Sequence, residues 1–129
     1  MARIKRRTSG SRLITWETVR ELARVLPGVQ EGISYGTPAF RVCGKLFVRF
    51  HQSGECIVVR MEPEERAMRL QADPKAFFIT DHYHNYPWML VRLSAVRRDD
   101  LRDLVEESWR KCAPKRLLAV HDAGYRGQT

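Results

Sequence analysis

Two segments with apolar residues at helical spacing, 15–26 and 99–112, lie near opposite ends of the chain and constrain its fold most strongly. An amphipathic helix is stable only when its apolar face packs against another element. Between the two segments lie short runs of β-branched and aromatic residues, separated by turn-forming residues. This order predicts two helices packed on one face of a sheet, with Thr15 capping the first helix and Pro27 ending it.

Short connections between the extended runs predict an antiparallel sheet. Cys43 and Gly44 are typical of a tight primed hairpin turn, and 52–55 predicts a second turn. A short helix beginning at Pro63 and ending near residue 71 separates the third run from the fourth. The loop-like segment 29–38 is rich in glycine and small polar residues. The expected strands are 39–42, 45–50, 56–61, 77–80 and 88–93.

The fold class that follows is α+β, a single domain with an antiparallel sheet of about five strands and α-helices packed on one face. Alternation in the second strand places Leu46, Val48 and Phe50 on one side and Lys45, Phe47 and Arg49 on the other. The second face of the sheet is expected to be partly open, which makes it a candidate binding surface. We expect a basic flexible tail over 1–14, the folded domain over 15–120 and a C-terminal tail over 121–129.

Composition narrows the class of protein. No apolar run approaches the roughly 20 residues that a membrane-spanning helix needs, so we expect no membrane partner. Three scattered cysteines suit a reducing compartment and no disulfide framework, so we expect a cytoplasmic protein. The oligomeric state is left open.

Positive charge is concentrated at the N-terminus. The net charge is +8, and the first 12 residues contribute +5 of it with no acidic residue. Such a tail attracts phosphate or anionic lipid, or it only improves solubility. Its basic residues are Arg3, Lys5, Arg6, Arg7 and Arg12.

Basic residues also alternate with apolar and aromatic ones in the predicted hairpins. Basic side chains beside aromatic rings on an exposed sheet face suit phosphate contacts and base stacking. The competing interpretation is an ordinary solvated face, where arginine and lysine are common. The hairpin residues concerned are Arg41, Lys45, Arg49 and Arg60.

The densest polar and aromatic cluster is 81–88. Its His82 and His84 are two residues apart, which suits a shared ligand on a strand, but zinc sites take three or four ligands and no second pair stands at ligand spacing. We therefore expect no metal and no cofactor. No nucleophile elbow, P-loop or dinucleotide fingerprint occurs, so no catalytic residue is assigned and we expect no enzyme. A small-molecule pocket is an alternative, with the candidate residues Tyr35, His82, His84, Tyr86 and Trp88.

Several segments in order resemble the MmcQ/YjbR family. They are Thr18–Leu22 with Leu26–Val29, Tyr35–Val42, Gly44–Phe47, His82–Trp88, and Asp100–Leu104 with Ala113–Lys115. The resemblance covers about residues 15–120.

The resemblance implies an α+β fold similar to the frataxin-like and secretion-chaperone-like folds, and DNA binding through a double-wing arrangement of hairpins. It assigns no catalytic residue. His82 and Trp88 stand where members often carry a histidine and a tryptophan, whereas His84 replaces an asparagine that many members carry.

Three functions follow as hypotheses. The first is weak, largely phosphate-directed binding of nucleic acid, in the first place DNA, with low specificity. The second is a small-molecule site or an unrecognised enzymatic pocket at the histidine cluster. The third is a protein-interaction module that uses the open face or a sheet edge.

Overall fold

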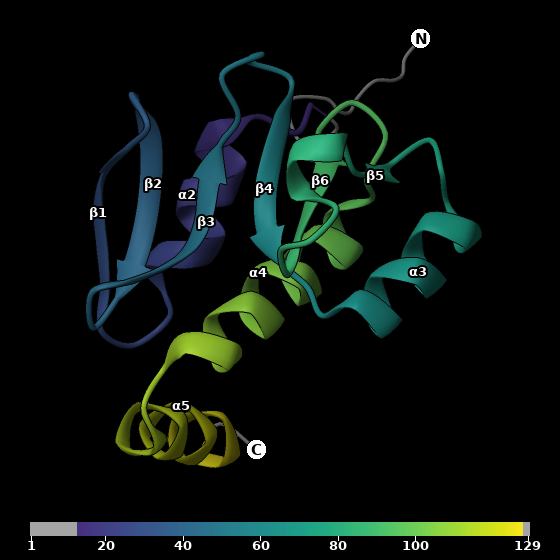
Figure 1. The fold of residues 1–129 in the computed structure, drawn as a ribbon. Coiled ribbons are helices and arrows are strands. Elements are labelled where there is room, and N and C mark those ends of the chain that lie inside the picture. The colour runs from purple at the N-terminus through teal and green to yellow at the C-terminus, as the bar shows by residue number, and fades with distance from the viewer. Residues whose placement is uncertain (1–12, 128–129) are drawn as a thin grey trace, which may run out of the picture.

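A six-stranded antiparallel sheet with the order β1-β2-β3-β4-β6-β5 forms the centre of the computed structural model, which describes residues 13–127 (Figure 1). β4 and β6 are neighbours in the sheet although a helix and β5 lie between them in the chain. The α+β class and the antiparallel sheet are therefore confirmed. The strands are β1 (Val29–Ser34), β2 (Thr37–Val42), β3 (Lys45–Phe50), β4 (Cys56–Arg60), β5 (Phe77–Phe78) and β6 (Trp88–Arg92).

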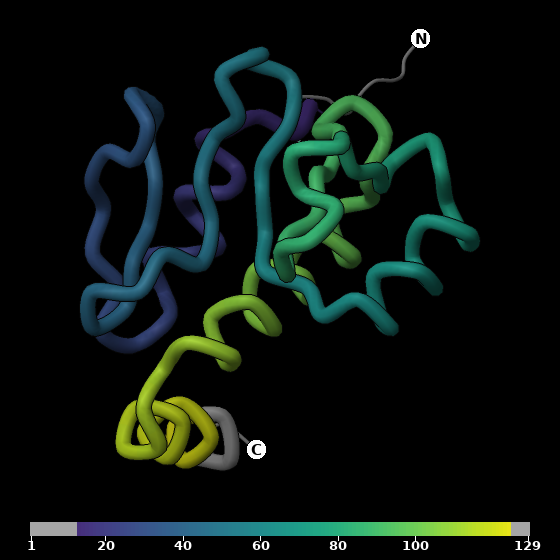
Figure 2. Tube along the Cα trace, viewed as in Figure 1, coloured from purple at the N-terminus to yellow at the C-terminus, as the bar shows by residue number. Residues whose placement is uncertain are grey.

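Helices cover one face of this sheet. α2 (Trp16–Arg24) and α4 (Arg98–Cys112) contact each other and the sheet, and both lie behind it in Figure 1. α3 (Pro63–Ala72) lies beside the edge strand β5, and the short 3-10 helix η2 (Asp81–Tyr83) lies in front of β6. Figure 2 shows the segment around η2 passing over the strands on the side opposite α2. We call the sheet face opposite α2 and α4 the open face.

The first helix forms as its sequence predicts. The Thr15 side chain accepts a hydrogen bond from the backbone N–H of Glu17, and the Thr15 N–H donates to the Thr18 hydroxyl, so both ends of the cap are satisfied. Val19 and Ala23 are fully buried, and the Trp16 ring stacks on Phe40 of β2 at a centroid distance of 5.4 Å. The cap and the apolar face together fix how α2 lies against the sheet.

The long helix α4 buries the face that its periodicity predicts. Its buried residues are Leu101, Leu104, Val105, Ser108, Trp109 and Cys112. The Trp109 indole N–H donates to the carbonyl of Pro27 at 3.0 Å, which ties α4 to the end of the first helical segment. This bond satisfies the one polar atom of a large buried ring.

The segment 29–38 is where the sequence prediction is wrong, because it forms β1 and the start of β2 instead of a loop. β1 is an edge strand, and most of its residues are exposed or half-buried, so no apolar alternation marks it. Its pairing depends on backbone hydrogen bonds and on the turn Tyr35-Gly36, where both residues have positive φ, 53° and 79°. That combination is typical of a primed hairpin turn, and Cys43-Gly44 forms another, as predicted.

A β-bulge in β3 corrects the predicted alternation. Val48 pairs with Phe40 and Leu46 pairs with Arg41, so Phe47 is an extra residue in β3. Phe47 joins Val48 in the main core, whereas Leu46 lines the cavity on the open face. Because of this extra residue, Phe47 points to the helix side of the sheet and not to the side of Arg49, where strict alternation placed it. An alternation with a period of two cannot predict a bulge.

The hydroxyl of Ser108 connects β3 and β4 beyond the point where their pairing ends. The β3–β4 ladder stops at the pair Val48–Val59. The Ser108 hydroxyl of α4 donates to the carbonyl of Phe47, and its oxygen accepts a hydrogen bond from the N–H of Arg60 at 2.9 Å. One buried side chain therefore satisfies two backbone groups that the diverging strands leave unpaired.

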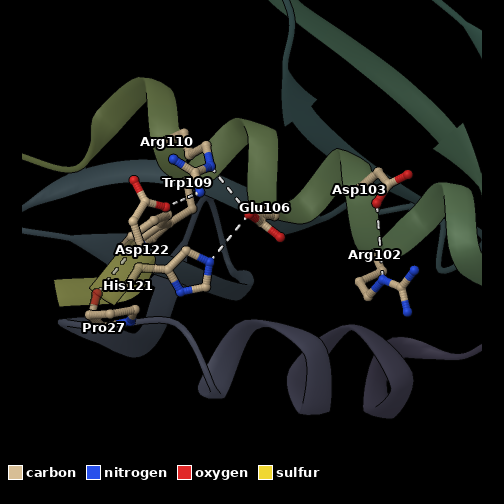
Figure 3. Close-up of polar contacts among 8 residues, drawn as sticks. All are labelled: Pro27, Arg102, Asp103, Glu106, Trp109, Arg110, His121 and Asp122. Carbon is tan, nitrogen blue, oxygen red and sulfur yellow. Dashed lines mark hydrogen bonds and ion pairs between the residues drawn. The ribbon is translucent and has the colours of Figure 1, made fainter. Parts of the chain in front are cut away.

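The C-terminal region also differs from the expectation of a tail over 121–129. Residues Lys115–Gly127 form helix α5, so the domain does not end at residue 120. Leu117 belongs to the main core, and His121 lies edge-on to the Trp109 ring at 5.1 Å (Figure 3). The Arg110 guanidinium donates to Asp122 at 2.7 Å. α4 ends at Cys112, the chain turns at Pro114, and α5 follows at once.

We predict that Trp109→Ala lowers the free energy of unfolding by roughly 3–5 kcal/mol, because it opens a cavity and leaves the Pro27 carbonyl unpaired. Urea unfolding followed by circular dichroism measures this. Trp109→Phe should cost less, since it keeps most of the apolar contact. An unchanged midpoint for Trp109→Ala would contradict the packing of α4 described above.

Ser108→Ala provides a second test of the fold. The change removes only the hydroxyl, and it leaves the Phe47 carbonyl and the Arg60 N–H without a partner, so we expect a loss of roughly 2–3 kcal/mol in unfolding free energy. The exposed Ser94→Ala is the control, with an expected change within about 0.5 kcal/mol. Equal unfolding free energies for the two variants would rule out the bridging role of Ser108.

Candidate functional site

A cavity of about 790 Å³ opens on the open face, over the region where β3 and β4 separate. Aromatic rings and neutral polar groups dominate its lining, Arg49 is its one residue of fixed charge, and none of the lining residues is acidic. These residues are Tyr35, Leu46, Arg49, His51, Gln52, Val58, Thr80, His82, Tyr83, Tyr86 and Trp88. A volume in this range is typical of sites for small molecules or for one unit of a polymer.

Arg66 of α3 holds the segment that forms one wall of the cavity. Its side chain is only 6% exposed, and its guanidinium donates to four backbone carbonyls. Two of the distances are 2.7 Å to Tyr86 and 3.0 Å to Tyr83; the other two acceptors belong to His84 and Trp88. A planar group with five donors can satisfy this many carbonyls at once. Arg66 thereby orders a segment that has almost no regular secondary structure.

Arg49 of β3 lines the cavity, and its hydrogen bonds differ from those of Arg66. The residue is 7% exposed, and no carboxylate within residues 13–127 pairs with it. Its Nη2 donates to the Tyr83 hydroxyl at 2.6 Å, and its Nη1 makes longer bonds of 3.3–3.4 Å to Thr37, Phe50 and Gln52. A buried cation without a counter-ion is costly, so the site favours an anion.

Tyr35 is placed over Arg49 by the β1–β2 turn. The guanidinium carbon of Arg49 lies 5.3 Å from the centroid of the Tyr35 ring, in a cation–π arrangement. The residue is nonetheless 85% exposed, and its φ of 53° lies in the left-handed region that few bulky residues adopt. Tyr35 therefore combines an exposed ring with an unfavourable backbone conformation.

The two histidines of the cavity differ in their surroundings. His51 Nδ1 accepts a hydrogen bond from the N–H of Ser53 at 3.2 Å, which places the ring proton on Nε2 in the neutral form. Burial, followed by the charge of Arg49, lowers the pKa of His51. At neutral pH His51 is therefore an uncharged donor. His82 lies edge-on to Tyr83 at 4.8 Å and tilted to Tyr86 at 6.4 Å.

The proposed pocket residues are partly brought together. Tyr35, His82, Tyr86 and Trp88 line the cavity, whereas the lining does not include His84, whose carbonyl binds Arg66. Within the described chain, no three His, Cys, Asp or Glu side chains are grouped closely enough to hold a metal ion. Whether the cavity binds a ligand stays a prediction.

The four hairpin basic residues do not share one surface. Arg41 lies on the open face and bonds to the carbonyl of Ile33, and Arg60 lies 5.7 Å from the Trp88 ring centroid. Lys45 pairs with buried Val42, so it belongs to the helix side of the sheet. The tail residues Arg3, Lys5, Arg6, Arg7 and Arg12 lie outside the described residues.

Sequence reasoning missed Arg66, Tyr83 and Arg92. Tyr83 stood within the recognised cluster, but its contact with Arg49 spans 34 residues and only the fold shows it. Arg66 resembles any solvated helix residue in the sequence, and no local signal distinguishes it. Arg92 of β6 lies over Phe78 at 4.0 Å and donates to the carbonyls of Pro74 and Lys75, which adds a fourth arginine to the open face.

Charge is distributed unequally between the two sides of the sheet. The ion pairs among residues 13–127 lie within or between helices α2, α3, α4 and α5, or join α2 to Glu31, and Figure 3 shows part of this network around Glu106. Glu31 pairs with Phe40, whose side chain faces the helices. The four open-face arginines have no carboxylate partner within the described part of the chain. Within the described residues, no carboxylate therefore forms an ion pair with the arginines of the open face.

The cysteines offer no reactive centre in this region. Cys56 and Cys112 are buried, and burial raises the pKa of both thiols, so little thiolate forms at neutral pH. Cys43 is exposed at a hairpin turn, on the far end of β2 from the cavity's Tyr35. All three thiols are free.

None of the described helices is long and apolar enough to cross a membrane.

The chain is similar in sequence to proteins of two mycobacteria and similar in fold to one solved structure. Uncharacterized proteins of Mycobacterium bovis and of Mycobacterium tuberculosis are 40% identical to this chain over 67 residues. The match covers 51% of this chain and 52% of theirs, so the chain spans about half the length of the curated relatives it matches. A crystal structure of the Deinococcus radiodurans protein DR2400, with the domain DUF419, has a TM-score of 0.65 at 21% identity, over 76% of this chain and 78% of that one. This likeness concerns the fold alone.

A family model extends over most of the described structure. The YjbR model matches residues 24–111, which include all six strands, α3 and nearly all of α4. Every residue that lines the cavity falls within this range. The resemblance recognised in the sequence is thereby confirmed: the chain belongs to the YjbR family.

Proposed function

We propose that this protein binds nucleic acid, in the first place DNA, through the open face of its sheet and its basic N-terminal tail. The observation that carries the proposal is the set of unneutralised arginines Arg41, Arg49, Arg60 and Arg92 on that face. Arginines that lack a carboxylate partner are suited to phosphate, because the guanidinium fork matches two phosphate oxygens.

Aromatic rings beside these arginines support the same proposal. Arg49 lies by Tyr35, Arg60 by Trp88 and Arg92 by Phe78. Tyr35 is exposed, whereas Trp88 and Phe78 are half-buried. Cations next to accessible rings suit both the backbone and the bases of a nucleic acid, and stacking on rings is tolerant of sequence. The tail adds five positive charges within the first 12 residues.

Low sequence specificity is part of the proposal. Sequence is read mainly by side chains that enter a groove, most often from a helix. Helices α2 and α4 pack on the covered face of the sheet, and their outer sides carry acidic as well as basic residues. Binding would therefore depend mainly on phosphate contacts and fall steeply as salt increases.

A small-molecule site is the second candidate function. The cavity on the open face favours it, because it encloses a buried cation and several rings in a volume of about 790 Å³. The two functions differ in their salt dependence, since a single anionic ligand releases few counterions whereas a polyanion releases many.

We predict that Arg41→Gln/Arg60→Gln weakens binding to duplex DNA and reduces the slope of log affinity against log salt by about 1.8, since each lost phosphate contact accounts for roughly 0.9. Fluorescence anisotropy at four or more salt concentrations measures this slope. The matched control is Arg98→Gln/Arg102→Gln, which removes the same charge from α4. Equal effects of the two double variants would show that only net charge matters and would remove the open face from the proposal.

Removal of residues 1–12 tests the contribution of the tail. Five phosphate contacts would change the slope by about 4–5, but a run of basic residues rarely engages phosphate with every charge, so we expect a change of about 2–3. An unchanged slope would assign the contacts to the folded domain alone. Failure of the full chain to bind single-stranded DNA, duplex DNA or RNA at low salt would refute the proposed function.

A further inference from the structure

We propose that the cavity on the open face receives a single nucleoside-monophosphate unit, with its phosphate at Arg49 and Tyr83 and its base against the rings at the cavity mouth. The inference deepens the proposed function and rests on it, since the unit would be one nucleotide of a bound single strand. A free mononucleotide has the same chemistry, so the test below separates the two sources.

The anion end of the site is built from two donors. Within the described chain, Arg49 has no hydrogen bond from its Nε, and its Nη1 bonds are long at 3.3–3.4 Å, so donor capacity remains. The Tyr83 hydroxyl accepts from Arg49 Nη2 at 2.6 Å, and its own proton is therefore free to be donated. With no acidic side chain in the lining, no carboxylate of the cavity competes with an incoming phosphate.

The ring end lies close to the anion end. Tyr35 and Tyr86 are both largely exposed, and Tyr86 and His82 lie with their rings 6.4 Å apart at the same cavity. Exposed rings gain apolar contact when a base stacks on them. Arg66 contributes here as a positioning residue, because its bond to the carbonyl of Tyr86 fixes the backbone that presents the ring.

The backbone of Tyr35 indicates that its ring has a role beyond the turn. A primed turn at this position is best served by Asn-Gly, since asparagine tolerates positive φ and a bulky aromatic does not. This chain has Tyr35-Gly36, with φ values of 53° and 79°. Residues held in sparsely populated backbone regions cluster at functional sites, and here the strained residue is the one that covers Arg49.

The cavity selects single strands over duplexes. A base within a duplex reaches a cavity only after it is unpaired and rotated out of the stack, whereas an unpaired base enters freely. We therefore expect a single-stranded octanucleotide to bind at least about tenfold more tightly than a duplex of the same length, at equal salt.

The test uses Tyr35→Asn in the full chain, because this change removes the ring and relaxes the turn. We expect its melting temperature to be equal or higher, while its affinity for the single strand and for adenosine 5′-monophosphate falls about fivefold or more. Cys43→Asn is the matched control: Cys43 occupies the same place in the other primed turn, with φ 49°, and does not line the cavity. It should gain similar stability and keep full affinity for both probes.

The phosphate contact is tested separately with adenosine and with Arg49→Gln. Adenosine should bind at least about tenfold more weakly than adenosine 5′-monophosphate, and Arg49→Gln should remove most of that difference. Nuclear magnetic resonance titration measures both affinities and reports directly whether the variant is folded. If Arg49→Gln does not fold, the adenosine comparison and Tyr35→Asn still decide the question.

The outcomes separate this inference from the proposed function. If neither Tyr35→Asn nor loss of the phosphate changes affinity, while Arg41→Gln/Arg60→Gln still weakens DNA binding, the inference is overturned and the proposed function stands. If no polynucleotide binds but adenosine 5′-monophosphate binds in a Tyr35-dependent manner, the cavity is a mononucleotide site and the proposed function is refuted. Equal binding of single strand and duplex would also overturn the inference.

Discussion

The hydrogen bonds that Ser108 makes to β3 and β4 allow these strands to diverge beneath the cavity of the open face. A continuous ladder would bring the two strands together along their whole length, but the bulge at Phe47 ends the pairing at Val48–Val59. Without a substitute, two backbone groups would be buried and unpaired, which is costly. The Ser108 hydroxyl supplies the missing donor and acceptor, so the strands can diverge at little cost. The cavity lies over this divergence, with Leu46 on one side and Trp88 on the other.

Two buried arginines, Arg66 and Arg49, have different roles: the first orders a segment of the chain, and the second faces the cavity. Arg66 donates to four carbonyls at 2.7–3.0 Å, and its role is to order the segment that carries Tyr83 and Tyr86. Arg49 has one short bond and three long ones, and it faces the cavity. Both lack a carboxylate partner within residues 13–127. The geometry of their acceptors, more than their burial, separates a structural cation from one that is available to a ligand.

The arrangement of charge links the fold to the proposed function. Many acidic residues lie on the helices, where Glu17 pairs with Arg20 and Asp122 pairs with Arg110. The sheet contributes arginines to the open face at alternate strand positions, with aromatic neighbours in place of acids. Helices cover one face of the sheet, and four arginines lie on the other face, which also holds aromatic rings and the cavity of about 790 Å³. Family membership by itself would not place any of these groups.

Local patterns in the sequence determined the elements whose faces are strongly apolar. α2 and α4 could be predicted with their buried residues, and so could the Thr15 cap, the turn at Cys43-Gly44 and four of the six strands nearly to their ends. These features depend on hydrophobic periodicity and turn chemistry, which act over a few residues. Four of the five candidate pocket residues were also close to one another in the fold, because three of them share one short segment.

Only the tertiary structure decided the remaining features, because each depends on contacts between residues far apart in the chain. β1 is defined by its pairing with β2, since an edge strand needs no apolar face of its own. The bulge at Phe47 depends on the partner strand and on Ser108, which lies 61 residues away. Arg49 meets Tyr83 across 34 residues, and Arg66 meets Trp88 across 22. A sequence specifies such contacts through the whole fold, and no short window of residues contains the information that places them.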